Sequence, residues 1–315
     1  MFIILHKNNI FFKCIYMRIL YGLINNNIDV TELCYNKLNY NNIISIPCGD
    51  NERASFFTDP IFGTKKKIFI KKDDNSDLLE FEDNLELKIN INTFKIETVK
   101  TVDINKKLLQ IQKILKIKHG SFNEEVPEQK MVVRYLRGNE KVLEIGGNIG
   151  RNSLIIASIL RNNNNNNFVC LESDPDISRK LCENRDINNF HFFVENSALS
   201  KRKLIQSGWS TIVSDVLLDG YKKINTITLE ELHRKYNIYF DTLVLDCEGA
   251  FYYILMDMPE ILDNINLIIM ENDYNDISHK NYIDNILKEN NFALDYVEKG
   301  GWGPCFNNFF EVWKK

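Results

Sequence analysis

Val142-Leu-Glu-Ile-Gly-Gly-Asn-Ile-Gly150 decides the fold of this chain, because an apolar run containing one acid leads directly into a glycine-rich turn. The residues that follow, 151–160, have the composition of a helix. This order is typical of a buried parallel strand that enters a tight turn and opens a helix. Gly146 and Gly150 lack Cβ, so the backbone can turn sharply and approach a ligand closely. The stretch therefore predicts an α/β domain that binds a nucleotide-like cofactor.

The residues around the turn exclude two of the cofactor classes that use such a turn. A phosphate-binding P-loop needs Lys and then Ser or Thr after its last glycine, whereas Arg151 and Asn152 stand here. A dinucleotide fold needs G-x-G-x-x-G, which the spacing of Gly146, Gly147 and Gly150 does not match. What remains is E-x-G-x-x-x-G, which resembles the first motif of S-adenosylmethionine-dependent methyltransferases. A glycine-containing turn in another α/β domain is the open alternative.

Further candidates for cofactor binding are an acid and an asparagine of this first stretch and polar residues at the ends of later apolar runs. Glu144 would supply negative charge near the cofactor's ammonium and sulfonium, and Asn148 belongs to the turn itself. The run Phe168–Leu171 ends in Glu172, and an acid at the tip of a second strand can bind both ribose hydroxyls. Asn196 and Ser197 follow the expected third strand and suit the adenine edge.

The second half of the chain alternates predicted strands with predicted helices. Right-handed crossovers between such strands give a mostly parallel sheet with helices on both faces. The last two runs, 293–297 and 308–313, predict an antiparallel closing pair, and 162–167, six asparagines, predicts an exposed loop. The expected parallel strands are 141–145, 168–172, 190–194, 241–247 and 266–271.

Six ordered motifs between about residues 120 and 315 resemble the FkbM family of methyltransferases. They are the turn Glu144 to Gly150, Glu172, Asn196 to Leu199, Thr228 to Glu230, Asp246 to Gly249, and Glu271. The asparagine-rich composition and the Gly-Trp-Gly-Pro-Cys motif near the end of the sequence resemble those of giant-virus members of that family. Phe251 is a departure, because the family commonly has a second acid there, so the chain does not support a mechanism that requires that acid.

The resemblance implies a Rossmann-like, S-adenosylmethionine-dependent O-methyltransferase acting on a hydroxyl of a sugar, glycan or small molecule. Two alternatives stay open: an inactive binding module that keeps the cofactor fold, and a protein or RNA methyltransferase. Asp246-Cys-Glu-Gly249 differs from the Asn-Pro-Pro-Tyr type of motif common in protein N-methyltransferases.

The candidate catalytic residues follow the predicted fourth and fifth strands. Asp246 is the first candidate for the base or for orienting the acceptor, and it also borders the cofactor; Glu248 and Glu271 are alternatives. An ordinary aspartate has a pKa of about 3.9, so burial would have to raise it before it could act on an alcohol. No metal is expected. The less favoured reading is a cation held by Asp246, Asn272 and Asp273, since hard cations prefer oxygen ligands.

Four further residues are candidates for contacting the acceptor. Trp209 and Trp302 stand in predicted loops, where an aromatic face can stack on a sugar. Asp273 and His279 follow the fifth strand, although a surface loop position is the simpler reading for the histidine. Core packing is an equally good explanation for either tryptophan.

Composition narrows the classes of partner. The chain has 315 residues, 44% hydrophobic, with 39 basic and 43 acidic side chains and a net charge of −4, so nucleic-acid binding is not expected. Seven cysteines without Cys-x-x-Cys spacing predict neither disulfides nor zinc and favour a reducing cytoplasm, of the host if the protein is viral. No run approaches a membrane span, and the oligomeric state is not predicted.

The organisation expected along the chain has four parts. Residues 1–16 would be an upstream extension that does not pack, and 17–98 a β-rich accessory module resembling one found in DnaJ-like proteins, either substrate-facing or passive. Residues 99–140 would hold linking helices, over 101–118 with a stop at Gly120 and over 127–138. Residues 141–315 would form the methyltransferase domain.

Overall fold

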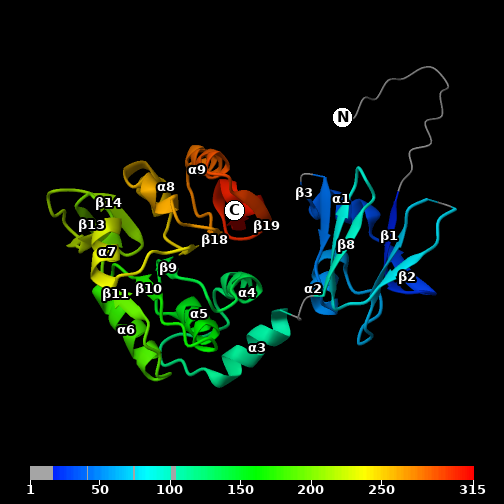
Figure 1. Cartoon of the computed structure of the whole chain (residues 1–315), viewed down its shortest axis with the longest axis horizontal. Helices are drawn as coiled ribbons and strands as arrows, with labels where there is room; N and C mark the ends of the chain where they lie inside the picture. Colours follow the sequence, from blue (N-terminus) through cyan, green and yellow to red (C-terminus); the bar gives the residue numbers. More distant parts are fainter. Residues whose placement is uncertain (1–16, 41, 74, 101–103) are drawn as a thin grey trace, which may run out of the picture. The chain divides into compact units, whose positions relative to one another are not determined.

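The computed structural model describes residues 17–40, 42–73, 75–100 and 104–315. The chain divides into two compact units, Met1–Lys106 and Lys107–Lys315 (Figure 1). The expectation about residues 1–16 lies outside the described residues. Among those described, there is no helix with the length and apolar character that crossing a bilayer requires.

The first unit is built from two four-stranded antiparallel sheets around one apolar core. One sheet has the order β2-β1-β5-β6 and the other β3-β4-β7-β8. The β-rich character expected of this part of the chain is present, whereas its two helices, α1 and α2, were not predicted. The elements are β1 (Arg18–Leu23), β2 (Asn26–Asp29), α1 (Thr31–Lys37), β3 (Asn39–Tyr40), β4 (Ile43–Ile46), α2 (Asp50–Phe57), β5 (Lys67–Lys71), β6 (Leu79–Phe81), β7 (Leu85–Asn90) and β8 (Ile96–Lys100).

A buried lysine organises the loop between α2 and β5. Lys66 is 1% exposed, and its ammonium contacts Asp59 at 2.7 Å and Asp50 at 3.0 Å. It also donates to two backbone carbonyl oxygens of the same loop. A buried ammonium with this many partners is fully satisfied. The Asp-Pro-x-x-Gly stretch that begins at Asp59 is therefore a structural loop built around Lys66.

The second unit contains a seven-stranded sheet with the order β11-β10-β9-β17-β18-β20-β19. Neighbours are parallel except that β20 is antiparallel to both β18 and β19. This confirms the predicted mostly parallel sheet with a reversed last strand. The strands are β9 (Val142–Ile145), β10 (Phe168–Leu171), β11 (Phe193–Glu195), β17 (Thr242–Leu245), β18 (Leu267–Glu271), β19 (Ala293–Glu298) and β20 (Phe310–Lys314).

The central strands are buried on both faces because helices cover both faces. Every residue of β9, β10 and β17 is buried, as expected for parallel strands between two helical layers. In Figure 1, α4, α5 and α6 lie on one side of the sheet and α7, α8 and α9 on the other. The helices are α3 (Ile104–Ile114), α4 (Val126–Tyr135), α5 (Arg151–Arg161), α6 (Pro175–Asp186), α7 (Leu229–Tyr236), α8 (Ala250–Asp257) and α9 (Ile277–Glu289).

Local signals in the sequence set where these helices begin. Asp174 caps α6 by accepting from the backbone N–H groups of Asp176 and Ile177. Thr228 and Glu231 form a capping box at the start of α7. The Thr228-Leu-Glu motif is thus explained by helix capping.

Several boundaries differ from the sequence expectations. The third strand is 193–195 rather than 190–194, because Phe190 and Phe192 are used as buried side chains. The helix predicted over 101–118 ends at Ile114, well before Gly120, and residues 101–103 lie outside the described part.

Two parallel short strands, two 3₁₀ helices and a three-stranded antiparallel sheet after β11 were not predicted. They are β12 (Ala198–Leu199) with β16 (Thr226–Ile227), η1 (Pro259–Leu262), η2 (Gly303–Asn308), and β13 (Leu204–Ser207), β14 (Ser210–Val213) and β15 (Lys222–Lys223).

Candidate functional site

The candidate residues lie at the carboxyl ends of the parallel strands of the large sheet. They surround the point where the order of the strands reverses. From β9 the chain builds outward through β10 and β11, and it then returns to place β17 and β18 on the other side of β9. Ligands of open parallel sheets bind at such a switch point, beyond the carboxyl ends of the strands. The glycine turn, Glu172, Asp246 and Glu271 all follow carboxyl ends at this edge, as the sequence predicted.

The glycine turn is shaped by neighbouring protein atoms. Gly146 has φ +90°, and a Cβ on it would lie 1.6 Å from the carbonyl oxygen of Asp246. A Cβ on Gly147 would lie 2.1 Å from the sulfur of Cys170. Gly150 has φ +91° and caps α5. Gly146 and Gly147 are therefore required because atoms of β10 and of the residue that follows β17 leave no room for a Cβ. This requirement holds whether or not a ligand also approaches the turn.

Glu144 does not present an open carboxylate to a cofactor. It is 2% exposed, and Ser153 of α5 donates its hydroxyl to the Glu144 carboxyl group. Burial raises the pKa of Glu144 to about 8. Burial thus disfavours the negative charge that the sequence led us to expect of Glu144, and the hydrogen bond from Ser153 ties β9 to α5.

Glu172 joins the glycine turn to the tip of β10. Its two carboxylate oxygens accept from the backbone N–H groups of Asn148 at 2.9 Å and Asp174 at 2.8 Å. Burial raises the pKa of Glu172, and these two N–H groups oppose that rise. A carboxylate has about four acceptor positions. The carboxylate therefore keeps acceptor capacity for a ligand such as the hydroxyls of a ribose.

Asn196 and Ser197 use their donors inside the protein. The Asn196 amide donates to the carbonyl oxygens of Glu172 and Ser173, at 2.8 and 3.1 Å. The Ser197 hydroxyl donates to Glu195 at 3.0 Å. Both residues therefore position the tip of β10 and the loop beside it. Their side-chain donors bind protein atoms, and their contact with an adenine edge stays a prediction.

A strap formed by residues 115–125 is tied to the glycine turn through one buried amide. Asn184 of α6 is fully buried and accepts from the backbone N–H groups of Lys118 and His119. Its amide nitrogen donates to the carbonyl oxygens of His119 and Ile149, the latter within the turn. The side chain thus satisfies four backbone groups at once.

Asn184→Ala is expected to destabilise the second unit by about 3 kcal/mol, because buried backbone groups lose their partners. Urea unfolding followed by tryptophan fluorescence measures this unit alone, since all three tryptophans (209, 302 and 313) lie in it. Asn188→Ala is the matched comparison: it also holds the strap, through Lys116, but is partly exposed, so water replaces its bonds. Equal losses in the two variants would contradict the role of Asn184.

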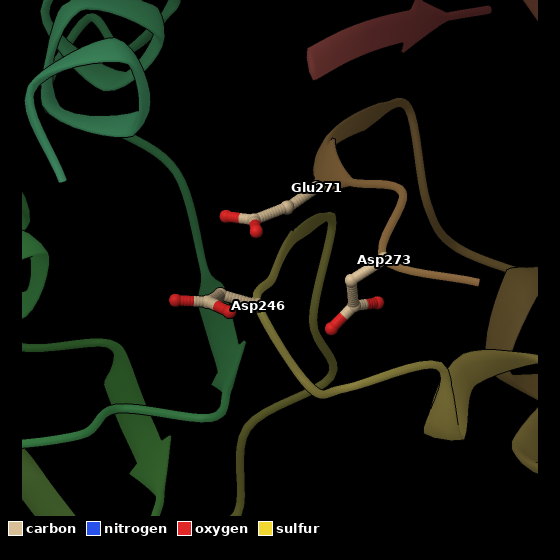
Figure 2. Close-up of side chains that lie close together, drawn as sticks. All are labelled: Asp246, Glu271 and Asp273. Atoms are coloured by element: carbon tan, nitrogen blue, oxygen red, sulfur yellow. The ribbon is translucent and has the colours of Figure 1, made fainter. Parts of the chain in front are cut away.

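Three carboxylates converge beyond β17 and β18. One oxygen from each of Asp246, Glu271 and Asp273 lies within 4.8 Å of the others. Figure 2 shows them together: Asp246 lies on the segment that leaves β17, Glu271 at the end of β18, and Asp273 on the segment that leaves β18. Asp273 is 6% exposed, and one of its oxygens accepts from the Gly249 N–H at 2.7 Å.

The proximity of these acids raises their pKa values. Burial, then the charges of Glu125 and Glu128, raise the pKa of Asp246 well above its usual range. Burial, then a hydrogen bond with Glu128, raise the pKa of Glu271 to about 11. Burial, then the charge of Glu248, raise the pKa of Asp273 to about 7. The raised pKa that Asp246 needs for work as a base is thus present.

Two acids at the start of α4, Glu125 and Glu128, also belong to this cluster. Glu125 makes no cap hydrogen bond; it binds Arg151 at 2.6 Å and accepts from the Asn148 amide at 3.1 Å. Glu128 is 7% exposed, contacts Glu271, and has one carboxylate oxygen without a partner. The signal in the sequence that could have found them is the crowding of three acids, Glu124, Glu125 and Glu128, within five residues.

The remaining candidates differ in their surroundings. Glu248 has φ +51° and is exposed. Asn272 is fully buried, and its amide nitrogen donates to the carbonyl oxygen of Asn308 at 2.7 Å, while its amide oxygen has no hydrogen-bond partner. Phe251 is fully buried, which explains an apolar residue at that position of α8.

The aromatic candidates and His279 stay predictions as acceptor contacts. Trp209, at the tip of the β13–β14 hairpin, is 60% exposed, and Trp302, between β19 and β20, is 47% exposed. His279 lies in the first turn of α9 and not in a loop, and it stacks on Tyr252 with ring centroids 3.8 Å apart.

No family model matches the sequence, and no curated protein matches it. Solved structures similar to the chain include a ribosomal protein L11 methylase from Lactobacillus delbrueckii subsp. bulgaricus, at 12% identity and TM-score 0.39, covering 63% of this chain and 81% of that one. An O-methyltransferase from Bacillus cereus in complex with SAH has 14% identity and TM-score 0.37, covering 69% and 93%. An rRNA methylase from Streptococcus thermophilus has 8% identity and TM-score 0.38, covering 62% and 98%. These values are too low to assign an activity.

Proposed function

We propose that this chain is an S-adenosylmethionine-dependent methyltransferase of the FkbM type that methylates a hydroxyl of a sugar, glycan or small molecule. The observation that carries the proposal is Glu172. Its carboxylate is anchored by the backbone N–H groups of Asn148 and Asp174, at the switch point of the sheet, and keeps acceptor capacity for ribose hydroxyls.

The charges beside the turn support this cofactor over a phosphorylated one. S-adenosylmethionine has a cationic sulfonium and ammonium and no phosphate. Acidic groups lie around Asp246, namely Glu125, Glu128, Glu248 and Asp273. Such a set attracts a cation and repels a pyrophosphate. The same repulsion, with the net charge of −4, disfavours a nucleic acid as the acceptor.

The protein has only to position the acceptor and accept its proton, because the methyl group of the cofactor is already activated. The acceptor oxygen attacks the methyl carbon, the sulfur–carbon bond breaks to leave a neutral thioether, and the acceptor proton passes to a carboxylate. Asp246 is the proposed base. Its backbone packs against Gly146 of the turn, and burial raises its pKa, which makes it a stronger base than an exposed aspartate.

Calorimetry with S-adenosylmethionine tests the cofactor, and methyl transfer to a panel of nucleotide sugars and glycans tests the acceptor. Glu172→Ala is expected to weaken cofactor binding by about 100-fold, since it removes two charge-assisted hydrogen bonds. Asp246→Asn is expected to keep the cofactor and lower turnover by about 100-fold, the usual worth of a general base.

The matched control is Asp263→Asn, which removes one negative charge at an exposed position after η1. It should change neither binding nor turnover. No binding by the unaltered protein, or unchanged binding in Glu172→Ala, would refute the cofactor assignment. Full turnover in Asp246→Asn would remove that residue from the mechanism.

A further inference from the structure

We infer that β14 is an interface between two copies of this chain, which pair edge to edge and antiparallel across a two-fold axis at Ile212. The pairing joins two three-stranded sheets of the order β14-β13-β15 into one sheet of six strands. In Figure 1, β13 and β14 lie at the left-hand margin of the second unit. The pairing does not depend on the proposed methyl transfer.

β14 differs from the other edge strands because it carries no charged residue. Natural edge strands are commonly protected by charges, proline or a bulge, since their unpaired backbone groups invite a further strand. β14 reads Ser-Thr-Ile-Val, and its register with β13 has no bulge. Among edge strands of three or more residues in the described ranges, all the others contain an acid. They are β2 (Asp29), β6 (Glu80), β8 (Glu97), β11 (Glu195) and β19 (Asp295 and Glu298).

The free edge of β14 presents the backbone groups of two residues. The N–H of Ser214, directly after β14, donates to the carbonyl oxygen of Lys203 at 3.1 Å. Along an antiparallel strand, successive residues point their backbone groups alternately toward and away from the partner strand. The N–H and C=O groups of Thr211 and Val213 therefore point away from β13, and they have no hydrogen-bond partner in the described part of the chain.

A two-fold axis at Ile212 satisfies all of these groups at once. Thr211 of each copy then lies opposite Val213 of the other copy, and the two pairs exchange four backbone hydrogen bonds. The two Ile212 side chains face each other between these pairs, and no like charges are opposed, because β14 has none. Thr211 and Val213 are exposed in the single chain, Val213 to 55%.

Exposed apolar side chains continue the interface beyond the ends of the strand. Trp209 precedes β14 and is 60% exposed, and Val216 follows β14 and is 67% exposed. The antiparallel register, continued past the strand ends, brings Trp209 of one copy near Val216 of the other. This contact occurs twice, once on each side of the axis, as a self-complementary interface requires. Pairing therefore removes apolar surface from water in addition to forming hydrogen bonds.

The sheet that carries β14 is anchored on one side and blocked at its other edge. Lys222 forms an ion pair with Asp174, and Gln206 accepts from the Ser173 hydroxyl at 3.3 Å, which ties β15 and β13 to the segment after β10. The edge of β14 is thus ordered before it pairs, which lowers the entropic cost of association. β15 consists of two lysines, a protection against further strands. The assembly therefore closes at two copies.

Sedimentation equilibrium of the full chain tests the pairing. We expect a reversible monomer–dimer equilibrium with a dissociation constant of about 30 µM or tighter, and no larger species. A protein that stays monomeric at ten times that concentration, or that forms open-ended oligomers, would overturn the inference.

Two variants place the interface on β14. Val213→Lys adds a charge to the edge, and Thr211→Pro removes an outward N–H without breaking the ladder to β13. Each should weaken the dimer by at least about tenfold, while urea unfolding shows that the second unit stays folded. The matched control is Ile114→Lys, at a residue of α3 that is 68% exposed, and it should keep the dimer. Unchanged dimerisation in both β14 variants would assign the dimer to another surface and refute the interface.

Cysteine cross-linking tests the position of the axis. In Ile212→Cys the two introduced residues form a non-hydrogen-bonded pair with Cα atoms about 4.5 Å apart, within reach of a disulfide. In Ser210→Cys the two introduced residues lie roughly 14 Å apart along the strands, too far for one. Mild oxidation should therefore link Ile212→Cys into a dimer, but neither Ser210→Cys nor the unaltered protein. Equal linking of Ser210→Cys and Ile212→Cys would refute the axis at Ile212.

Discussion

Gly146→Ala is expected to destabilise the second unit by more than about 4 kcal/mol, or to prevent its folding, and to abolish cofactor binding. The added Cβ would lie 1.6 Å from the Asp246 carbonyl oxygen and 2.7 Å from its carbonyl carbon. Both are backbone atoms of a segment held between strands, so neither can rotate away. The φ of +90° adds strain for any residue with a side chain.

Gly220→Ala is the matched control for this variant. Gly220 has φ +75°, but a Cβ there meets nothing within 4 Å. It therefore isolates the backbone strain, about 1 kcal/mol, from the collision. Urea unfolding followed by the fluorescence of the three tryptophans compares the two variants in the same unit. A loss in Gly146→Ala no larger than that in Gly220→Ala would show that the contact with Asp246 does not constrain the turn.

Glu144→Gln is expected to remove a loss of stability that the unaltered protein suffers as the pH rises. The folded-state pKa of Glu144, about 8, is above its ordinary value of 4.5, so the folded chain keeps a proton that the unfolded chain releases. This contribution is complete below about pH 4.5 and is lost as the pH rises toward 8. Glutamine cannot ionise, so it avoids a cost of up to about 4 kcal/mol at pH 8.

The measurement is the free energy of unfolding of both proteins from pH 5 to pH 8. Other acids with raised pKa values, Asp273 and Glu271, contribute to the slope of both proteins, so the difference between the two curves isolates Glu144. Glu230→Gln changes an exposed acid of α7 and should leave the curve of the unaltered protein unchanged. Parallel curves for Glu144→Gln and the unaltered protein would refute the neutral state of Glu144.

The sheet was predictable because its strands leave a simple trace in the sequence. β9, β10, β17 and β18 are short apolar runs that end in an acid or a glycine turn, and one rule about the carboxyl ends of parallel strands then brought Glu172, Asp246 and Glu271 to one edge. The rule gives the position of a residue along the chain. It does not give the direction of its side chain.

The errors follow from that missing direction. Glu144 is an acid inside a strand that is buried on both faces, so its carboxyl group points to Ser153 and not to the open edge. Asn196 and Ser197 spend their donors on nearby protein atoms. Glu125 and Glu128 come from a helix that precedes the sheet in the sequence, and only the packing of α4 beside β18 brings them to the site.

β20 is the strand through which β19 joins the large sheet. β19 pairs with β20 and not with β18, and β20 pairs with β18 across about forty intervening residues. Until residues 310–314 insert beside β18, neither strand of the β19–β20 pair belongs to the large sheet. Contacts of such long sequence separation form slowly. The exposed edge of β18 in that interval is where a second chain could pair by mistake during refolding.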